Sequence, residues 1–394
     1  MHNLPFLFRS LRFGVGSTIS EITLFLVIHQ GFEQLEKECY FLAMETSVDF
    51  LNYLDHDMSV KILMCLEDPS DLVRFSCVSR SWRRFVVANG LSKQLCLRMF
   101  PCLHRVVHVT EPSCSFNKSL EVGCSKFMEW ENLEMEHRAY SFLAQGCSSF
   151  PLTECISYAI SASSTDHFPE ESVHNTLEPI DMFPRSPSYW SSIGQSNPAV
   201  PETLIYKLLA DICVITEIRI QPFQDYFDLG HPIYSAKAVR FRMGHAKVPL
   251  HDPIDEPLDC CLDDKFLWTY TSPEFPMAQE NCLQKFELPE PVLCIGGILQ
   301  VELLGRVYKH YMDGLFYICV SHVQAVGRPL WSAFGVEILE PSGKFVLKVH
   351  NYTQVSLAEE HPFARPKGVV VEEYGWNEEN VESDEDVEFD FDFV

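Results

Sequence analysis

The sequence predicts an α+β protein of several domains: a small three-helix module, a helical linker, an antiparallel β-sandwich (jelly roll) and a disordered acidic tail. The first observation is length, because 394 residues exceed the roughly 250 at which a single hydrophobic core stops growing. The second is a change from apolar residues at helical spacing to short alternating runs beyond residue 150. The third is that the chain has no basic residue after Lys367.

Composition limits the classes of partner. Hydrophobic residues make up 46% of the chain and aromatic residues 12%, which is enough to form a sizeable core. A formal net charge of −25 opposes a general affinity for nucleic acids or anionic lipids, because the long-range field repels phosphate groups, and it favours basic partners. The 15 cysteines include no CxxC pair, so we expect reduced thiols and a cytoplasmic or nuclear location.

Residues 1–43 are expected to form a disordered upstream extension. Their most apolar run, Ile22–Ile28, is too short to span a bilayer and lacks the nearby cleavage pattern of a secretory signal. Near Met44 the composition changes from basic and apolar to acidic and helix-capped. We therefore interpret Met44 as an alternative start.

Three short helices are predicted in residues 45–90. The first carries an apolar stripe at four-residue spacing, formed by Met58, Ile62 and Leu66. The second begins at Asp68-Pro69, because aspartate is a favoured N-cap and proline is pre-organised for the first helical position.

Ser79 caps the third predicted helix, in which Trp82, Phe85 and Val86 share one face. Three helices in under fifty residues bury too little surface for robust independent stability. We therefore expect another part of the chain, or a partner, to cover the remaining apolar groups.

The module resembles the F-box, whose pattern runs from Leu-Pro through a helix with Ile-Leu and a closing Leu, then Asp-Leu, to Val-Ser-Arg-x-Trp-Arg. The matching positions are Leu54, Ile62, Leu63, Leu66, Asp71, Leu72 and Val78 to Arg83. The chain departs from the pattern at Asp55, His56 and Asp57, where Leu-Pro-x-Glu is usual. The resemblance covers about one eighth of the chain, and its Val-Ser-Arg-x-Trp-Arg ending is its most specific part.

This resemblance implies that the module docks on the Skp-type adaptor of a cullin ubiquitin ligase. The adaptor-binding residues carried over to this chain are Leu54, Ile62, Leu63, Leu66, Pro69, Leu72, Val73, Val78 and Trp82. Two alternatives remain for the module: a helical subdomain that only packs on the rest of the chain, and nucleic-acid stacking by Arg80, Arg83 and Arg84 beside Trp82. The acidic charge of the chain disfavours the second, because short basic clusters are usually a solvated helix face.

Residues 91–150 are predicted to be a helical and loop linker. An amphipathic helix at Leu91–Phe100 ends at Pro101, and a second helical pattern covers residues 127–143. The intervening segment holds scattered potential zinc ligands: Cys102, His104, His108, Cys114 and Cys124. Since strong zinc sites have closely paired ligands, we predict loop or core side chains here and no metal site.

Residues 151–365 are predicted to form the β-sandwich. The expected strands are Cys213–Ile220, Ala238–Met243, Val292–Ile295, Ile298–Leu303 and Leu315–Val323. Polar and apolar residues alternate in several of them, as on half-buried antiparallel strands, and no helix of crossover length lies between them.

Four phrases in order make this region similar to the galactose-binding-like (discoidin-type) sandwich. They are Ala162-Ser163-Ser164, Asn175-Thr176-Leu177, Tyr189-Trp190-Ser191-Ser192 and Glu202–Leu208. Combined with an F-box, this order resembles a group of plant F-box proteins. Sandwiches of this type bind ligands through loops at one end, so the candidate target-binding residues are Trp190, Trp268, Tyr270 and Phe275, although large aromatic side chains are mostly core.

No catalytic motif is found: the chain lacks GxSxG, HExxH, a Walker loop and GxGxxG. Histidines and carboxylates gather in residues 231–264 without the spacing of a calcium loop, which indicates a solvated loop. Residues 371–394 alternate acids with phenylalanine and are expected to be a disordered, solubilising or partner-docking tail.

Together these features predict a non-catalytic, substrate-recruiting subunit of a Skp–cullin–F-box ubiquitin ligase. The module would bind the adaptor and the sandwich an unknown protein or glycoprotein target, with no nucleic acid, membrane or cofactor involved. Two alternatives remain: a carbohydrate- or small-ligand-binding sandwich capped by the helices, and a nuclear co-regulator acting through its acidic tail.

Overall fold

A computed structural model describes residues 51, 54–112, 125–178, 187–226, 228, 230–248, 265–339 and 342–352. All of them belong to one compact unit, Met1–Glu359. The predictions for residues 1–43, the histidine and carboxylate run beyond residue 248, the tail at 371–394, Cys114 and Cys124 lie outside these residues.

Four short helices form the first part of the described chain. They are α3 (His56–Met64), α4 (Pro69–Ser76), α5 (Arg80–Ala88) and α6 (Leu91–Met99). The Asp68 side chain accepts a hydrogen bond from the Ser70 backbone N–H at 2.8 Å, and the Ser79 hydroxyl accepts one from the Trp82 N–H at 3.1 Å. The predicted starts of the second and third helices are therefore confirmed, with the capping residues that the sequence indicated.

The core of this helical module draws on all four helices. Leu63, Leu72 and Val86 are buried together with Leu91 and Leu95, which come from α6. The helix at 91–99, expected in the linker, thus supplies part of the module's own core. Helix α6 covers apolar side chains of the first three helices, which are too short to bury them among themselves.

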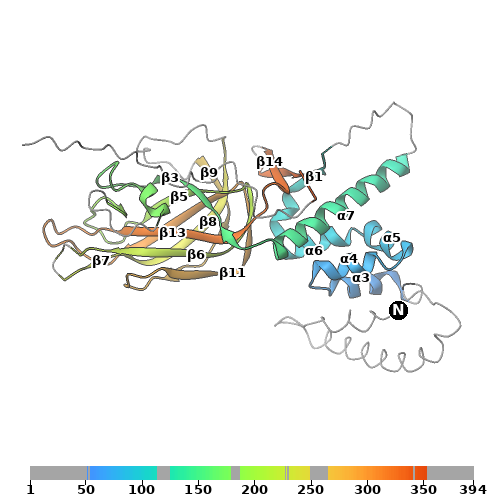
Figure 1. Ribbon diagram of the computed structural model, residues 1–394, viewed down its shortest axis with the longest axis horizontal. Helices are drawn as coiled ribbons and strands as arrows, with labels where there is room; N and C mark the ends of the chain where they lie inside the picture. The colour runs from blue at the N-terminus through green and yellow to red at the C-terminus, as the bar shows by residue number, and fades with distance from the viewer. Residues whose placement is uncertain are drawn as a thin grey trace, which may run out of the picture. The chain divides into compact units, whose positions relative to one another are not determined.

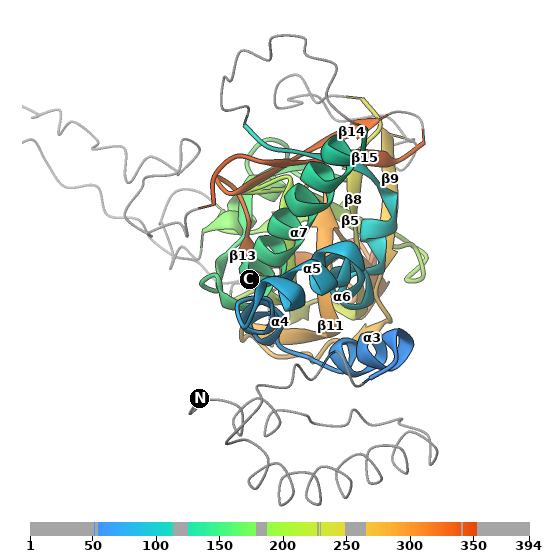
Figure 2. The same cartoon turned by 90° about the vertical axis from the view of Figure 1, so that its right-hand side faces the viewer.

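A small mixed layer connects the module to the rest of the unit. It consists of α7 (Ser125–Ser149), the short 3₁₀ helix η2 (Pro101–Arg105) and a three-stranded sheet in the order β1 (Val106–Thr110), β15 (Lys344–Val349), β14 (Phe334–Leu339). Strand β1 pairs in parallel with β15, so that Val106 lies opposite Phe345. Figure 2 shows α7 lying across this sheet. Strands β14 and β15, which lie within the range 151–365 expected for the sandwich, therefore form a separate sheet with β1 of the linker.

Two antiparallel sheets form the sandwich, as predicted (Figure 1). The first has the order β10 (Phe275–Pro276), β8 (Ala236–Ala246), β12 (Ile298–Arg306), β5 (Glu202–Leu208), β3 (Ile156–Ala162), with β9 (Phe266–Thr271) paired to β8. The second has the order β11 (Gln284–Ile295), β6 (Ile212–Gln224), β13 (Cys319–Pro329), β2 (Thr153–Glu154), with β4 (Trp190–Ser191) on β13 and β7 (Ile233–Tyr234) on β6.

Alternation along the strands explains this packing. On β8, Val239, Phe241 and Met243 are fully buried in the core between the sheets, whereas Arg240 and Arg242 point away from it and both pair with Glu302 of the neighbouring β12. Opposite charges facing each other across a strand pair support the register that the apolar face requires.

The strand predicted from Leu315 begins only at Cys319. Before it, residues 307–317 form a loop in which the backbone of Phe316 makes isolated antiparallel β-bridges with Lys309 and with Gln195. None of the described helices is long and apolar enough to cross a membrane.

Candidate functional site

Four of the predicted adaptor-binding residues lie in the core of the helical module. Leu63, Leu66, Leu72 and Trp82 are all buried, and Trp82 stacks on Phe75 with a ring-centroid separation of 4.0 Å. In the free chain their side chains hold the helices together. These four side chains are therefore not on the accessible surface of the free chain.

The accessible members of the set lie at the end of α4. Val73 is 39% exposed and Val78 is 53% exposed. Leu54 and Ile62 are half-buried, and Pro69 is buried at the start of α4. The structure thus separates the predicted anchors into a core group and an accessible group.

Two exposed arginines lie close in sequence to the two exposed valines. Exposed Arg74 follows Val73 directly in sequence, and exposed Arg80 comes two residues after Val78. Arg74 Nη1 also lies 2.7 Å from Asp71 Oδ1, and Arg83 Nη2 lies 3.6 Å from Glu134 Oε1 of α7. We call Val73, Arg74, Val78 and Arg80 the docking face. An apolar pair with a basic border complements a partner surface that is apolar and acidic.

Helix α6 fixes the connection between α3 and α4. The Arg98 guanidinium donates to the carbonyl oxygens of Met64 and Leu66, the second at 2.6 Å. These are carbonyls at the end of α3, which have no partner within the helix. The core helices that carry the docking face are therefore held by a charge-assisted contact from the fourth helix.

A buried polar cluster joins α6 to α7. The Ser92 hydroxyl lies 2.8 Å from His137 Nδ1 and 2.8 Å from the Ser141 hydroxyl. Burial lowers the pKa of His137 below its usual 6.5, and the nearby positive charges of Arg83 and Arg138 lower it further. The neutral imidazole is therefore the form that this contact between the helices stabilises.

We expect the stability that His137 contributes to fall under acidic conditions. Its pKa is lower in the folded chain than in the unfolded chain, so the unfolded chain binds more protons and stability is lost as pH falls below about 6.5. The difference in free energy of unfolding between wild type and His137→Asn, measured by urea denaturation, should shrink between pH 7.5 and 5, by at most about 1.4 kcal/mol per pH unit. A difference that does not change with pH would contradict this.

Trp190, predicted at a target-binding rim, is fully buried in the sandwich. Its indole N–H donates to the Ser164 carbonyl at 3.0 Å, and its strand β4 pairs with β13. That prediction is corrected: an indole between the two sheets fills the core, and its polar atom is satisfied within the chain.

The other three predicted target-binding residues do not form one rim either. Trp268 packs in a small cluster with Phe266, whereas Tyr270 and Phe275 pack against the main core between the sheets. Thr269 is an extra residue on β9, because Met243 pairs with Tyr270 and Gly244 with Trp268. The extra residue reverses the alternation, which sends Trp268 and Tyr270 to different clusters although they are two residues apart.

The serine-containing phrases of the sequence meet at a buried ion pair. Arg306 and Glu202 are both almost fully buried and form a salt bridge. The hydroxyl groups of Ser163 and Ser164 donate hydrogen bonds to the same Glu202 carboxylate. Arg306 also donates to the Ser192 hydroxyl at 2.8 Å. These phrases therefore have a structural role, because each of these polar groups has a partner inside the sandwich.

Two loops of the sandwich meet beside this network, and sequence reasoning did not identify them. One follows β6 and contains Tyr226 and Asp228; the other precedes β13 and contains His310. The Tyr234 hydroxyl donates to Asp228 Oδ2 at 2.5 Å, and His310 Nε2 lies 3.7 Å from the same oxygen. These contacts join the loops, and Figure 1 shows β7 and the start of β13 at the same end of the sandwich.

Aromatic rings cover the junction of the two loops. The ring of Tyr234 packs edge-on against those of Tyr308 and Tyr317, with ring-centroid separations of 5.4 and 6.4 Å. The Tyr317 hydroxyl donates a hydrogen bond to Asp313 Oδ2 at 2.6 Å. Five exposed side chains lie on these loops: Tyr226, Tyr308, Tyr311, Met312 and Asp313. Together with Asp228, whose side chain is only 13% exposed, we call them the tyrosine–aspartate surface. A sequence signal existed in the aromatic run from Tyr308 to Tyr317, of which the strand predicted from Leu315 covered only the end.

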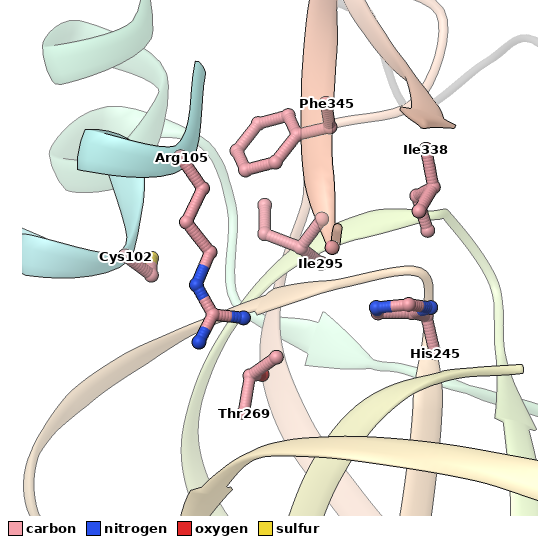
Figure 3. Close-up of a pocket in the computed structure, with 8 residues that line it drawn as sticks. Cys102, Arg105, His245, Thr269, Ile295, Ile338 and Phe345 are labelled. Atoms are coloured by element: carbon pink, nitrogen blue, oxygen red, sulfur yellow. The ribbon is translucent and has the colours of Figure 1, made fainter. Parts of the chain in front are cut away.

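One small cavity and one group of potential metal ligands were also considered. The cavity, lined in part by Arg105, His245 and Thr269, has a volume of about 10 Å³, which leaves room for a water molecule at most (Figure 3). Among the described residues, Asp166, His167 and Glu171 lie close enough together to hold a metal ion, and they are largely exposed. Exposed acidic groups of this kind are common without a metal.

Comparisons with known proteins agree with the helical module. A family model described as F-box-like matches residues 56–98, which span α3 to α6. F-box protein At4g00755 of Arabidopsis thaliana is 55% identical over 320 residues, covering 79% of this chain and 85% of the relative. Among solved structures, a family 32 carbohydrate-binding module of C. perfringens NanJ in complex with galactose covers 45% of this chain and 99% of that chain, at 11% identity and a TM-score of 0.28. The match to a fucolectin from Morone saxatilis (striped bass) serum covers 47% of this chain and 50% of the fucolectin, at 13% identity and a TM-score of 0.27.

The relative extends over most of the described chain, and the family model coincides with the four packed helices. The chain belongs to the F-box protein family.

Proposed function

We propose that this chain is the substrate-recruiting subunit of a Skp–cullin–F-box ubiquitin ligase. The observation that carries the proposal is the F-box-like match to residues 56–98, in a module whose exposed large apolar side chains, among the described residues, are those of Val73 and Val78. The docking face binds the Skp-type adaptor, and through it a cullin. The sandwich recognises the target, and the transfer of ubiquitin is carried out by other subunits.

Several features support the finer parts of this proposal. The docking face combines Val73 and Val78 with Arg74 and Arg80, which suits an acidic adaptor. The ten described cysteines are free thiols, which supports a reducing compartment, the cytoplasm or the nucleus. The net charge of −25 disfavours nucleic acids and anionic membranes as partners.

A pull-down with a purified Skp-type adaptor tests the proposal. Replacing Val73 and Val78 together by aspartate should weaken adaptor binding by an order of magnitude or more, because exposed apolar contacts at the centre of an interface carry much of its affinity. Both side chains are exposed, so the helical circular dichroism signal should remain that of wild type.

The matched control is Val248→Asp, which changes another exposed valine, outside the module. This variant should bind the adaptor like wild type. If wild type itself does not bind the adaptor, the ligase function is lost; if the double variant binds equally well, the docking face has been placed wrongly.

A further inference from the structure

We propose that the tyrosine–aspartate surface is the target-binding site and that it holds an arginine- or lysine-containing segment of the target protein. The inference rests on the proposed function, which it deepens by naming the surface and the chemistry of the target.

Three large side chains on the two loops are exposed to solvent. Tyr311 is 67% exposed, Met312 is 73% exposed and Tyr226 is 54% exposed, although large apolar side chains usually avoid water. All three lie on the two loops that meet at Asp228 and His310. Exposed aromatic residues and methionine are typical of the centres of protein interfaces.

Charge selects the partner. The Asp313 side chain is 38% exposed and borders the exposed rings, whereas Asp228 is 13% exposed and lies beneath them against Tyr234. His310 lies between the two carboxylates, and the Lys309 ammonium lies over the ring of Phe316 at 5.9 Å. The hydrogen bond from Tyr317, with that from the Leu315 N–H, lowers the pKa of Asp313, so this group is ionised at neutral pH. An arginine or lysine side chain can place its cation over a tyrosine face and donate to a carboxylate at the same time.

Buried contacts hold the second loop in place. Arg306, itself fully buried, donates to the carbonyl oxygens of Ile193 and Phe316, at 3.0 and 2.9 Å, and so fixes the base of the second loop. Gly194 lies so close beneath this loop that an added Cβ would stand 2.6 Å from the Tyr317 ring. Loops held in this way lose little conformational entropy when a partner binds, so exposed residues on them are suited to recognition.

A matched pair of peptides tests the chemistry directly. The probe is a fluorescent twelve-residue peptide of glycine and serine with three spaced arginines, and its counterpart carries citrulline in place of each arginine. Citrulline keeps the size and hydrogen-bonding shape of arginine without the charge. Fluorescence anisotropy at 150 mM salt, with the full chain, should show the arginine peptide binding at least ten times more tightly than the citrulline peptide.

Variants then locate the site. Replacing Tyr311 and Met312 together by alanine should weaken binding of the arginine peptide at least ten-fold, and Asp313→Asn should weaken it about three-fold. The control is Tyr158→Ala, an exposed tyrosine on β3, which should leave the affinity unchanged. This comparison separates the surface from a general attraction of the acidic chain for cations, which would be the same in all variants.

The outcomes distinguish this inference from the proposed function. Equal binding of both peptides, equal affinity of the double variant and wild type, or displacement of the arginine peptide by methyl galactoside would overturn the assignment to a basic segment. Adaptor binding by the Tyr311 and Met312 double variant should stay at the wild-type level. Loss of adaptor binding in wild type would instead reject the ligase function and leave the peptide result to stand by itself.

Discussion

Arg306→Met should lower the free energy of unfolding of the sandwich by about 3–5 kcal/mol, because removing one partner of a buried ion pair leaves the other charge uncompensated. The Arg306 side chain has no exposed area, and the Glu202 side chain is 3% exposed. The carboxylate would keep its contacts with Ser163 and Ser164, but two hydroxyl groups do not neutralise a buried charge.

The measurement is urea denaturation followed by tryptophan fluorescence, since Trp190 lies fully buried next to this network. The double variant Arg306→Met with Glu202→Gln should recover part of the loss, because it removes the isolated charge together with its partner. The single variant should also lose affinity for the arginine peptide, because Arg306 fixes the loop that carries Tyr311. A cost below about 1 kcal/mol would show that water or a rearranged partner reaches Glu202.

Trp82→Ala should unfold the helical module and abolish adaptor binding. Replacing a buried tryptophan by alanine costs about 3–5 kcal/mol through lost transfer free energy and the cavity that remains. Trp82 stacks on Phe75 in a core of few side chains, so little surrounding structure can collapse into the space. A module of this size has little stability to lose.

Circular dichroism and the adaptor pull-down should therefore change together in Trp82→Ala. In the double aspartate variant of Val73 and Val78 only the pull-down should change. Val248→Ala is the matched control, because its side chain is 69% exposed and lies outside the module, so its truncation should alter stability by less than about 0.5 kcal/mol and leave the pull-down unchanged. A Trp82→Ala chain that keeps its helical signal and loses the adaptor would instead place Trp82 at the interface.

The helical module could be predicted closely because its signals are local. Asp68 and Ser79 begin their helices by accepting backbone N–H groups two or three residues away, and the apolar stripes follow the helical period. Helix α6 was found but assigned to the linker. Its membership of the module depends on Leu91 and Leu95 meeting α3 and α4, a contact that no local pattern records.

The candidate site was predicted less well, for two physical reasons. An aromatic residue looks the same in sequence whether it fills the core, as Trp190 does, or faces water, as Tyr311 does. Strand β9 was not among the predicted strands, and one extra residue at Thr269 reverses its alternation, so the alternating pattern alone would assign its two faces wrongly.

The sequence by itself determined the order of the parts: a helical module that resembles the F-box, helices, and then alternating strands. It determined these because caps, helical stripes and strand alternation act over a few residues. Only the tertiary structure decided that β1 pairs with β15, more than two hundred residues away, and that the predicted adaptor anchors divide into a core and an exposed docking face. It also decided that the loops carrying Tyr226 and Tyr311 meet at Asp228. Contacts between distant segments depend on which surfaces pack together, and that information is not contained in any single stretch of the chain.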